Sequence, residues 1–264
     1  MSIKSICIFI FAFFCVLIQG AYVRRPSKIS GVKRSSIQEN PSMVSILLHG
    51  QHICGGVFIT SRHILTAAHC VSDDGAFGQG IVQNPTSDIM VASETNNCYY
   101  PKNIHEAKNI TVHPQYLGYF NNYINDIAIV EARIWITNNK RLVDRVAKLP
   151  RANTSSNVNA TVVGWGTSYE GEGELSEFLK KADVVTLDNS ECQRMIHTFV
   201  HPGQLCTIQF DDWGLCDGDS GGPLYSRSGE CLGIASMSSD CGKGTPDLYS
   251  RVFHYLEWIG ATIA

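Results

Sequence analysis

The stretch Gly218-Asp219-Ser220-Gly221-Gly222-Pro223 places a serine between glycines, a setting in which a hydroxyl can act as a nucleophile. Glycine lets the backbone bend so that the hydroxyl is presented while neighbouring N–H groups converge on one oxygen. The same residues also fit the nucleophile elbow of α/β-hydrolases, and clusters of glycine and serine are often plain turns. The position of a base and of the acid that orients it must decide between these interpretations.

A hydroxyl is a poor nucleophile at neutral pH until a base takes its proton, and a histidine fixed by a carboxylate is a common base. Most of the nine histidines lie in polar, loop-like contexts, but His69 follows an apolar run and two alanines that leave room around an imidazole. Asp126 stands just ahead of the apolar run 127–130, where an unpaired buried charge would be unfavourable. A pair with His69 would remove that penalty.

The chain around these residues consists of short apolar runs separated by clusters of glycine, proline, asparagine and serine. Sustained helical periodicity appears only near the end, on a face made by Val252, Leu256, Ile259 and Ile263. The pattern predicts barrels or sandwiches of antiparallel strands. The runs are 43–48, 57–59, 64–66, 127–130, 161–163, 184–187 and 232–235.

The first residues indicate the secretory pathway. Lys4 precedes an apolar run over 6–18 that ends in small residues, which is the pattern of a signal peptide covering 1–20. The run is short for a bilayer span, and no later stretch approaches the roughly 20 apolar residues that a spanning helix needs. Residues 21–28 are polar and basic, and we expect an activation cut at Lys28 that leaves a domain over 29–264.

The mature chain is expected to be acidic and disulfide-bonded. Loss of residues 1–28 removes four of the 21 basic residues and no acidic ones, which leaves 17 against 24 and a net charge of about −7. Such a surface argues against binding nucleic acid or anionic membranes through bulk charge. Cys7 and Cys15 leave with the signal, and a secreted chain should use most of its remaining cysteines in disulfides. We therefore expect a secreted, extracellular protein.

The strings around His69, Asp126 and Ser220, in that order, resemble those of chymotrypsin-like (trypsin-family) serine proteases. The likeness extends from Ile29 to the terminal helix. It implies an all-β fold of two six-stranded antiparallel β-barrels with a C-terminal α-helix, and an active site between the barrels. The other matching strings are Cys54-Gly55-Gly56, Gly164-Trp165-Gly166 and Pro246-Asp247-Leu248-Tyr249.

The resemblance also implies a role for each site residue in a secreted serine endopeptidase made as a zymogen. Ser220 would attack the scissile carbonyl, His69 would move the proton, and Asp126 would orient His69. The N–H groups of Gly218 and Ser220 would form the oxyanion hole. After the cut at Lys28, the new ammonium group of Ile29 would pair with Asp219, which would otherwise be a buried carboxylate without its cation.

The substrate pocket departs from the ordinary trypsin pattern. Trypsin-like members have an aspartate six residues before the nucleophile, where this chain has Gly214, followed by Leu215. Asp247 replaces a usual glycine on the facing wall, as in some arthropod serine collagenases. The resemblance therefore implies a pocket for Lys or Arg as well as Leu, Phe or Tyr. If Asp247 instead turns to solvent or binds a neighbouring donor, the pocket is chymotrypsin-like or elastase-like.

Other pocket residues follow from the same likeness. Ser236, Met237 and Ser238 are expected to line one wall, with Ser236 also near Asp126. Ser238 replaces a small glycine that commonly admits large side chains, so it narrows the pocket. Asp217 should disfavour acidic residues near the cleavage point and favour basic ones.

The cysteines follow the family in part. The resemblance implies the disulfides Cys54–Cys70, Cys192–Cys206 and Cys216–Cys241. Cys98 and Cys231 are left over, and they could pair with each other, stay free or bridge to another molecule.

Metal sites are not expected. His197 and His201 stand at helical spacing between two cysteines and superficially suggest zinc, but a disulfide is the default use of both cysteines outside the cell. The polar stretch 71–109 is typical of surface loops, and although its acidic residues could bind calcium, it has no spaced ligand loop. We expect neither a metal nor a cofactor.

Asn109, Asn153 and Asn159 begin glycosylation sequons, and Asn159 adjoins an expected strand. Expected partners are protein or peptide substrates, an activating trypsin-like protease and protein inhibitors of proteases, with no nucleic acid and no membrane.

Two rival functions remain. An α/β-hydrolase would use Ser220, then Asp240 or Asp247, then His254, but too little chain follows Ser220 and strands do not alternate with helices. A catalytically silent homologue acting as a secreted binding protein would keep the fold and lose the chemistry. The pocket has three atypical residues that could prevent substrate binding while the triad stays intact, namely Leu215, Met237 and Ser238.

Overall fold

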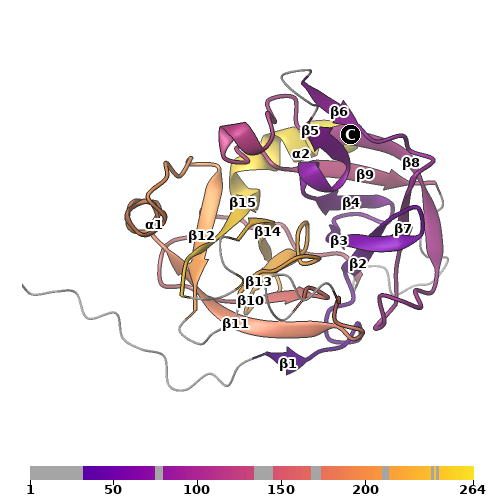
Figure 1. Ribbon diagram of the computed structural model, residues 1–264, viewed down its shortest axis with the longest axis horizontal. Coiled ribbons are helices and arrows are strands. Elements are labelled where there is room, and N and C mark those ends of the chain that lie inside the picture. Colours follow the sequence, from indigo (N-terminus) through magenta and orange to yellow (C-terminus); the bar gives the residue numbers. More distant parts are fainter. Residues whose placement is uncertain are drawn as a thin grey trace, which may run out of the picture.

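The computed structural model describes residues 32–74, 80–133, 145–167, 174–209, 214–238, 241 and 244–264, which form two β-barrels side by side (Figure 1). The first closes in the order β2-β3-β4-β9-β8-β7, and the second in the order β11-β10-β13-β14-β15-β12 through an additional pairing of β11 with β12. All pairings between these strands are antiparallel. The predicted pair of six-stranded barrels is confirmed, and an α/β-hydrolase architecture is not.

The first barrel consists of β2 (Met43–Leu48), β3 (Gln51–Phe58), β4 (His63–Thr66), β7 (Ile89–Ala92), β8 (Ile104–Val112) and β9 (Ala128–Ala132). The second consists of β10 (Asn159–Gly164), β11 (Lys180–Leu187), β12 (Gln204–Ile208), β13 (Pro223–Ser226), β14 (Cys231–Met237) and β15 (Asp247–Arg251). Outside the barrels lie β1 (Lys33–Arg34) at the edge of β11, the hairpin β5 (Ser72–Asp74) and β6 (Ile81–Gln83), α1 (Asn189–Ile196) and α2 (Leu256–Ile263).

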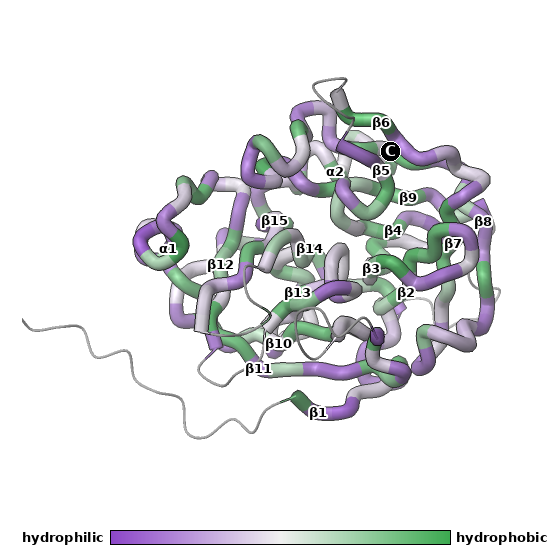
Figure 2. Tube along the Cα trace, viewed as in Figure 1, coloured by the Kyte–Doolittle hydropathy of each residue, from purple (hydrophilic) through white to green (hydrophobic). Residues whose placement is uncertain are grey.

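Apolar burial explains why the barrels pack as they do. Ile64, Val130, Trp165 and Ile259 are fully buried in one continuous cluster that joins the first barrel to the C-terminal helix. The second barrel has a core of its own that includes Leu224. Figure 2 shows hydrophobic colour along much of β3 and β4, whereas α1 is largely hydrophilic. Removal of apolar area from water is the main driving force for this arrangement.

One of the two helices is predicted by the sequence pattern and the other is not. The terminal helix is present as predicted, with Val252 in a 3₁₀ turn, Val252–Tyr255, before α2. Helix α1 was not predicted, because its exposed, polar sequence buries only Cys192. Its signal is the N-cap: the Asp188 side chain accepts a hydrogen bond from Ser190 N–H at 2.8 Å, and Glu191 lies in the first turn.

The expectation that 71–109 is a stretch of surface loops is wrong. It contains β5, β6, β7 and most of β8. Strand β8 buries Ala107 and Ile110, with a register irregularity between Ala107 and Asn109, and its other residues are exposed or half-buried. Its polar residues therefore face outward from a barrel strand.

Three disulfides join Cys54 to Cys70, Cys192 to Cys206 and Cys216 to Cys241, as the resemblance implies. The second of these uses both cysteines beside His197 and His201, which leaves no thiolate there for zinc. Cys98 and Cys231 are both free and both buried. The structure therefore contains free thiols, one of the three expected alternatives, and not a disulfide between these two cysteines.

The two free thiols should be unreactive in the folded protein and reactive after unfolding. Burial raises the pKa of Cys98 to about 11 and that of Cys231 to about 12, so almost no thiolate is present at neutral pH. Titration with a thiol-specific disulfide reagent at pH 8 should find no fast-reacting group, and unfolding in guanidinium without reductant should release two. A fast-reacting thiol in the native protein would contradict this burial.

Candidate active site

A cleft of about 520 Å³ is lined by residues from both barrels. The first barrel provides strand β3, the turn after β4 and the segment before β9, and the second provides the segment 215–220 and the end of β14. Among the described residues, its lining is Ile53, Cys54, His69, Cys70, Tyr123, Leu215, Cys216, Asp217, Gly218, Ser220, Ser236, Met237, Ser238 and Cys241.

Strand pairing brings His69 and Asp126 together. His69 lies in a 3₁₀ turn directly after β4, Asp126 precedes β9, and these two strands are paired. His69 Nδ1 is 2.7 Å from Asp126 Oδ2, and the backbone N–H of His69 donates to Asp126 Oδ1 at 3.0 Å. The Ser236 hydroxyl donates to Asp126 Oδ2 at 2.6 Å, as its expected position near Asp126 requires. These bonds satisfy a carboxylate that is fully buried.

The Asp126 carboxylate also sets the basicity of His69. Burial alone lowers the pKa of His69, but the charge and hydrogen bond of Asp126, with a smaller contribution from the charge of Asp74, outweigh it. The net effect raises this pKa above the usual value of 6.5. An imidazole with raised basicity takes a proton more readily, which suits general-base chemistry.

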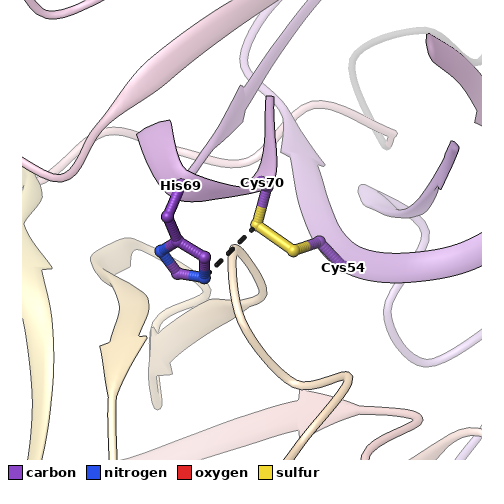
Figure 3. A group of neighbouring side chains, drawn as sticks. All are labelled: Cys54, His69 and Cys70. Carbon is purple, nitrogen blue, oxygen red and sulfur yellow. Dashed lines mark hydrogen bonds between the residues drawn. A yellow bond between two sulfur atoms is a disulfide. The ribbon is translucent and has the colours of Figure 1, made fainter. Parts of the chain in front are cut away.

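Figure 3 shows His69 with one ring nitrogen turned toward the disulfide of Cys54 and Cys70. His69 Nε2 is 3.8 Å from Cys70 Sγ. These three residues form the one cluster of metal-ligand types in the described part of the chain, but sulfur in a disulfide is not a thiolate ligand. Ser220 lines the same cleft without a hydrogen bond to His69 among the described residues, and such bonds often tighten only when substrate binds.

The turn that carries Ser220 leaves two backbone donors unpaired. The neighbouring N–H groups of Asp219 and Gly221 donate within the protein at 3.0 and 2.8 Å, whereas those of Gly218 and Ser220 find no acceptor among the described residues. Gly218 has φ of 93°, which favours glycine, and His52 Nε2 holds its carbonyl at 3.0 Å. Two fixed, unpaired donors beside a hydroxyl can bind a developing oxyanion.

Asp219 points away from the cleft into a buried site made by glycines. Its carboxylate accepts hydrogen bonds from Gly166 N–H at 2.7 Å and from Cys216 N–H at 3.2 Å. None of the ion pairs in the described residues includes Asp219, and burial raises its pKa to about 6. The charge of Lys180 acts on this carboxylate without forming one of these ion pairs, and the expected activation site at 28–29 lies outside the described residues.

Replacing Gly166 by alanine should destabilise the folded protein. The new Cβ would lie 2.2 Å from Asp219 Oδ2, so the carboxylate or the chain must move, at a typical overpacking penalty of about 1–3 kcal/mol. Thermal unfolding would measure it. Gly260→Ala is the matched control, because no atom lies within 4 Å of its Cβ position and alanine favours helix α2. Equal stability of Gly166→Ala and the parent would show that the site is not tight.

Five of the predicted pocket residues line the cleft, namely Leu215, Asp217, Ser236, Met237 and Ser238, and two stand behind it. Gly214 is buried beside Leu215. Asp247 is also buried, and its Oδ2 accepts a hydrogen bond from Leu215 N–H at 3.0 Å. Asp247 therefore binds a neighbouring donor through one oxygen, while its other oxygen has no hydrogen bond of ordinary geometry among the described residues.

Sequence reasoning missed Tyr123. Its ring packs edge-on against His69, with centroids 5.5 Å apart, and Tyr119 packs on Tyr123 in turn. Tyr123 has φ of 52°, a left-handed conformation that is uncommon for a bulky residue and typical of functional sites. Four aromatic residues within 116–123, just before Asp126, were the available signal.

The three sequons differ in exposure. Asn109 is exposed on β8, and Asn153 is exposed in a loop where its Oδ1 accepts from the Arg251 guanidinium at 3.1 Å. Asn159 is half-buried at the start of β10. Asn109 and Asn153 are thus the two sequon asparagines that are exposed to solvent.

Comparison with known proteins agrees with this geometry. The trypsin family model matches residues 29–259. Brachyurin of Leptuca pugilator is 29% identical over 83% of this chain and 91% of its own length, and trypsin Tyr p 3.0101 of Tyrophagus putrescentiae is 30% identical over 95% and 90%. The solved structure of human heparin binding protein has a TM-score of 0.71 at 26% identity and covers 88% of this chain and 96% of its own. No helix in the described residues has the length and apolar character to span a membrane.

Proposed function

This chain belongs to the trypsin family and is a serine endopeptidase, and we propose that it is secreted as a zymogen and activated by cleavage after Lys28. One observation carries the catalytic part of the proposal. The His69–Asp126 pair shares a cleft with Ser220, whose turn has two unpaired N–H groups.

In the proposed reaction, His69 Nε2 takes the proton of Ser220 Oγ while this oxygen attacks the carbonyl carbon of the substrate. His69 then gives that proton to the leaving amine as the C–N bond breaks, which leaves an acyl ester on Ser220. Water attacks the ester by the same route and releases the acid product. Asp126 keeps a proton on Nδ1, so that Nε2 is free to accept, and its charge stabilises the imidazolium.

The oxyanion of each tetrahedral intermediate would be bound by the N–H groups of Gly218 and Ser220. One such donor is typically worth about 3–4 kcal/mol in the transition state. The donors act strongly because their positions are fixed before the reaction, here by the bonds of the neighbouring amides and of His52.

Activation would work through Asp219. Cleavage after Lys28 would create an ammonium group at Ile29 that enters the glycine-lined site and pairs with the Asp219 carboxylate. The raised pKa of Asp219 supports this, because burial outweighs the charge of Lys180 and the two backbone hydrogen bonds, and a directly paired ammonium would stabilise the carboxylate. The expected result is that the new pair stabilises the oxyanion turn through Asp219, the neighbour of Ser220.

The proposed pocket takes large apolar side chains, and basic ones through the Asp247 oxygen that the Leu215 N–H does not bind. The cleft wall carries the apolar side chains of Leu215 and Met237, and the carboxylate of Asp247 stands directly behind Leu215. The exposed Asp217 at the rim would favour basic residues near the cut. Proposed partners are protein or peptide substrates, a trypsin-like activating protease and protein inhibitors of proteases, all outside the cell.

Active-site labelling tests the proposal. Purified precursor would be treated with a serine-directed fluorophosphonate before and after cleavage at Lys28, with the new N-terminus verified by sequencing. Labelling of Ser220 only after the cut is expected. Ser220→Ala, processed in the same way, should remain unlabelled. Labelling of the uncut chain at full rate would reject the activation mechanism.

Binding without catalysis is the second candidate, and the fold shared with human heparin binding protein is the observation that favours it. Heparin is a polyanion, however, and the mature chain carries a net charge of about −7. Absence of labelling and of peptide cleavage after verified processing would favour this candidate.

A further inference from the structure

We propose that Asp74 is a positioning residue for His69: it holds the segment 116–123 in the shape that keeps the Tyr123 ring against the imidazole. Asp74 is not among the residues that line the cleft, so it would act through Tyr123 and not by contact with a substrate. The proposal rests on the function of His69 as the base in the proposed reaction.

Asp74 belongs to the hairpin that follows the turn of His69. It ends strand β5, which starts two residues after the 3₁₀ turn Ala68–Cys70. The buried Ser72 hydroxyl, at the start of β5, donates to the Ala68 carbonyl at 2.8 Å. Because this bond joins β5 to the turn, Asp74 has a defined position relative to His69.

The Asp74 carboxylate binds the segment 116–123 at two points. Its Oδ2 accepts a hydrogen bond from the Tyr119 backbone N–H at 2.5 Å, and its Oδ1 accepts one from the Tyr116 hydroxyl at 3.3 Å. Between these two residues lies Gly118, which has a φ of 80° and where a Cβ would lie 2.4 Å from Asp74 Oδ1. The backbone of the segment therefore passes directly against the carboxylate. Among the described residues this carboxylate has no ion pair, and both of its hydrogen bonds lead to the segment.

The segment needs such contacts because its backbone is strained. Asn122 and Tyr123 both have φ of 52°, and such side chains rarely adopt this left-handed conformation unless their surroundings hold it. A second contact comes from the other barrel, where the buried Gln204 on β12 donates from Nε2 to the Asn122 carbonyl at 2.9 Å. The segment is therefore held from both sides, and Asp74 is the contact on the side of the first barrel.

A continuous series of contacts runs from Asp74 to the imidazole. Beyond the bond to Tyr119, the Tyr119 ring packs edge-on against Tyr123 with centroids 5.8 Å apart, and Tyr123 packs edge-on against His69 at 5.5 Å. If Asp74 releases Tyr119, the Tyr123 ring loses support and no longer limits the rotation of the His69 ring. A smaller fraction of enzyme molecules would then direct Nε2 at Ser220, which lowers the rate of the chemical step.

Substitution of Asp74 tests the proposal on the processed enzyme, with a peptide that the parent cleaves. Asp74→Ala should lower kcat about tenfold and change KM less, because a small displacement of a catalytic group slows the reaction strongly. Asp74→Asn should keep most of kcat, since its amide oxygen can accept from the Tyr119 N–H and its N–H₂ group can donate to the Tyr116 hydroxyl. Asp73→Ala, an exposed neighbour on the same strand, is the control and should match the parent. Equal kcat in Asp74→Ala and the parent, or an equal loss in both Asp74 variants, would overturn the proposal.

Gly118→Ala displaces the segment while Asp74 stays in place, so it provides the test if Asp74→Ala fails to fold. The new Cβ would meet the carboxylate, and kcat should fall as in Asp74→Ala. Gly80→Ala is the matched control, since Gly80 has a similar φ of 79° and no atom within 4 Å of its Cβ position. Thermal unfolding of each variant verifies that the assay measures folded protein. Full kcat in a folded Gly118→Ala variant would contradict the proposal.

A double variant identifies the route of the effect. Because Asp74 would act through Tyr123, Asp74→Ala combined with Tyr123→Ala should have the same kcat as Tyr123→Ala alone. Losses that multiply would mean that the two residues act independently, and the proposal would be wrong. If the processed parent neither cleaves a peptide nor reacts with the fluorophosphonate, the function of His69 as the base is rejected instead.

Discussion

Changing Asp126 to asparagine is expected to lower kcat for peptide hydrolysis by about 10⁴-fold, the loss known for this change in the same type of triad. The amide would present an N–H₂ group to His69 Nδ1, where the carboxylate oxygen now lies at 2.7 Å. His69 would then carry its proton on Nε2, the nitrogen that must accept the proton of Ser220. The amide also cannot stabilise the imidazolium by charge.

The pH profile distinguishes this explanation from simple misfolding. In the parent enzyme, the acid limb of the activity profile should lie above pH 6.5. Asp126 raises the pKa of His69, and protonated His69 cannot act as a base. In Asp126→Asn the remaining activity should fall only at lower pH, since the charge is gone. Asp183→Asn, an exposed carboxylate on β11, is the control and should change neither rate nor profile. An unchanged acid limb in Asp126→Asn would contradict the proposed pairing.

The sequence predicts the parts of this structure that rest on apolar alternation and on spaced motifs. The runs at 64–66 and 127–130 became β4 and β9, and their pairing alone brings His69 beside Asp126. Strand β8 was not predicted because most of its residues are exposed or half-buried. Helix α1 was not predicted because its main sequence signal is a single N-cap residue. Tyr123 escaped because its contact with His69 depends on a left-handed backbone that no local propensity favours.

Asp247 illustrates the limit of a positional analogy. The likeness to arthropod collagenases identifies the carboxylate but not its orientation, and orientation depends on which donors the packed backbone leaves available. Here Leu215 N–H takes one oxygen, and the other has no hydrogen bond of ordinary geometry among the described residues. The charge of this carboxylate is therefore set by its burial and its donors rather than by its sequence position.

Changing Asp219 to asparagine is expected to have opposite effects on the uncut and the cut protein. In the uncut chain Asp219 has a pKa raised to about 6, above its ordinary 3.8, so the folded state binds a proton more tightly than the unfolded state. Its contribution to stability is therefore present below pH 3.8 and is lost as pH rises through about 6. Asparagine carries no such charge, so at pH 8 the uncut variant should be more stable, by up to about 3 kcal/mol.

In the cut protein the same change should be harmful. A paired Asp219 carboxylate would be replaced by an amide facing a buried ammonium, and loss of one partner of a buried pair typically costs about 3–5 kcal/mol. If that pair orders the oxyanion turn, kcat/KM should fall by about 10²–10³-fold or more, since each 1.4 kcal/mol is a factor of ten. Denaturant unfolding and peptide hydrolysis at pH 8, on both forms of both proteins, measure the two effects. Destabilisation of the uncut variant, or full activity of the cut one, would show that the Asp219 charge does not drive activation.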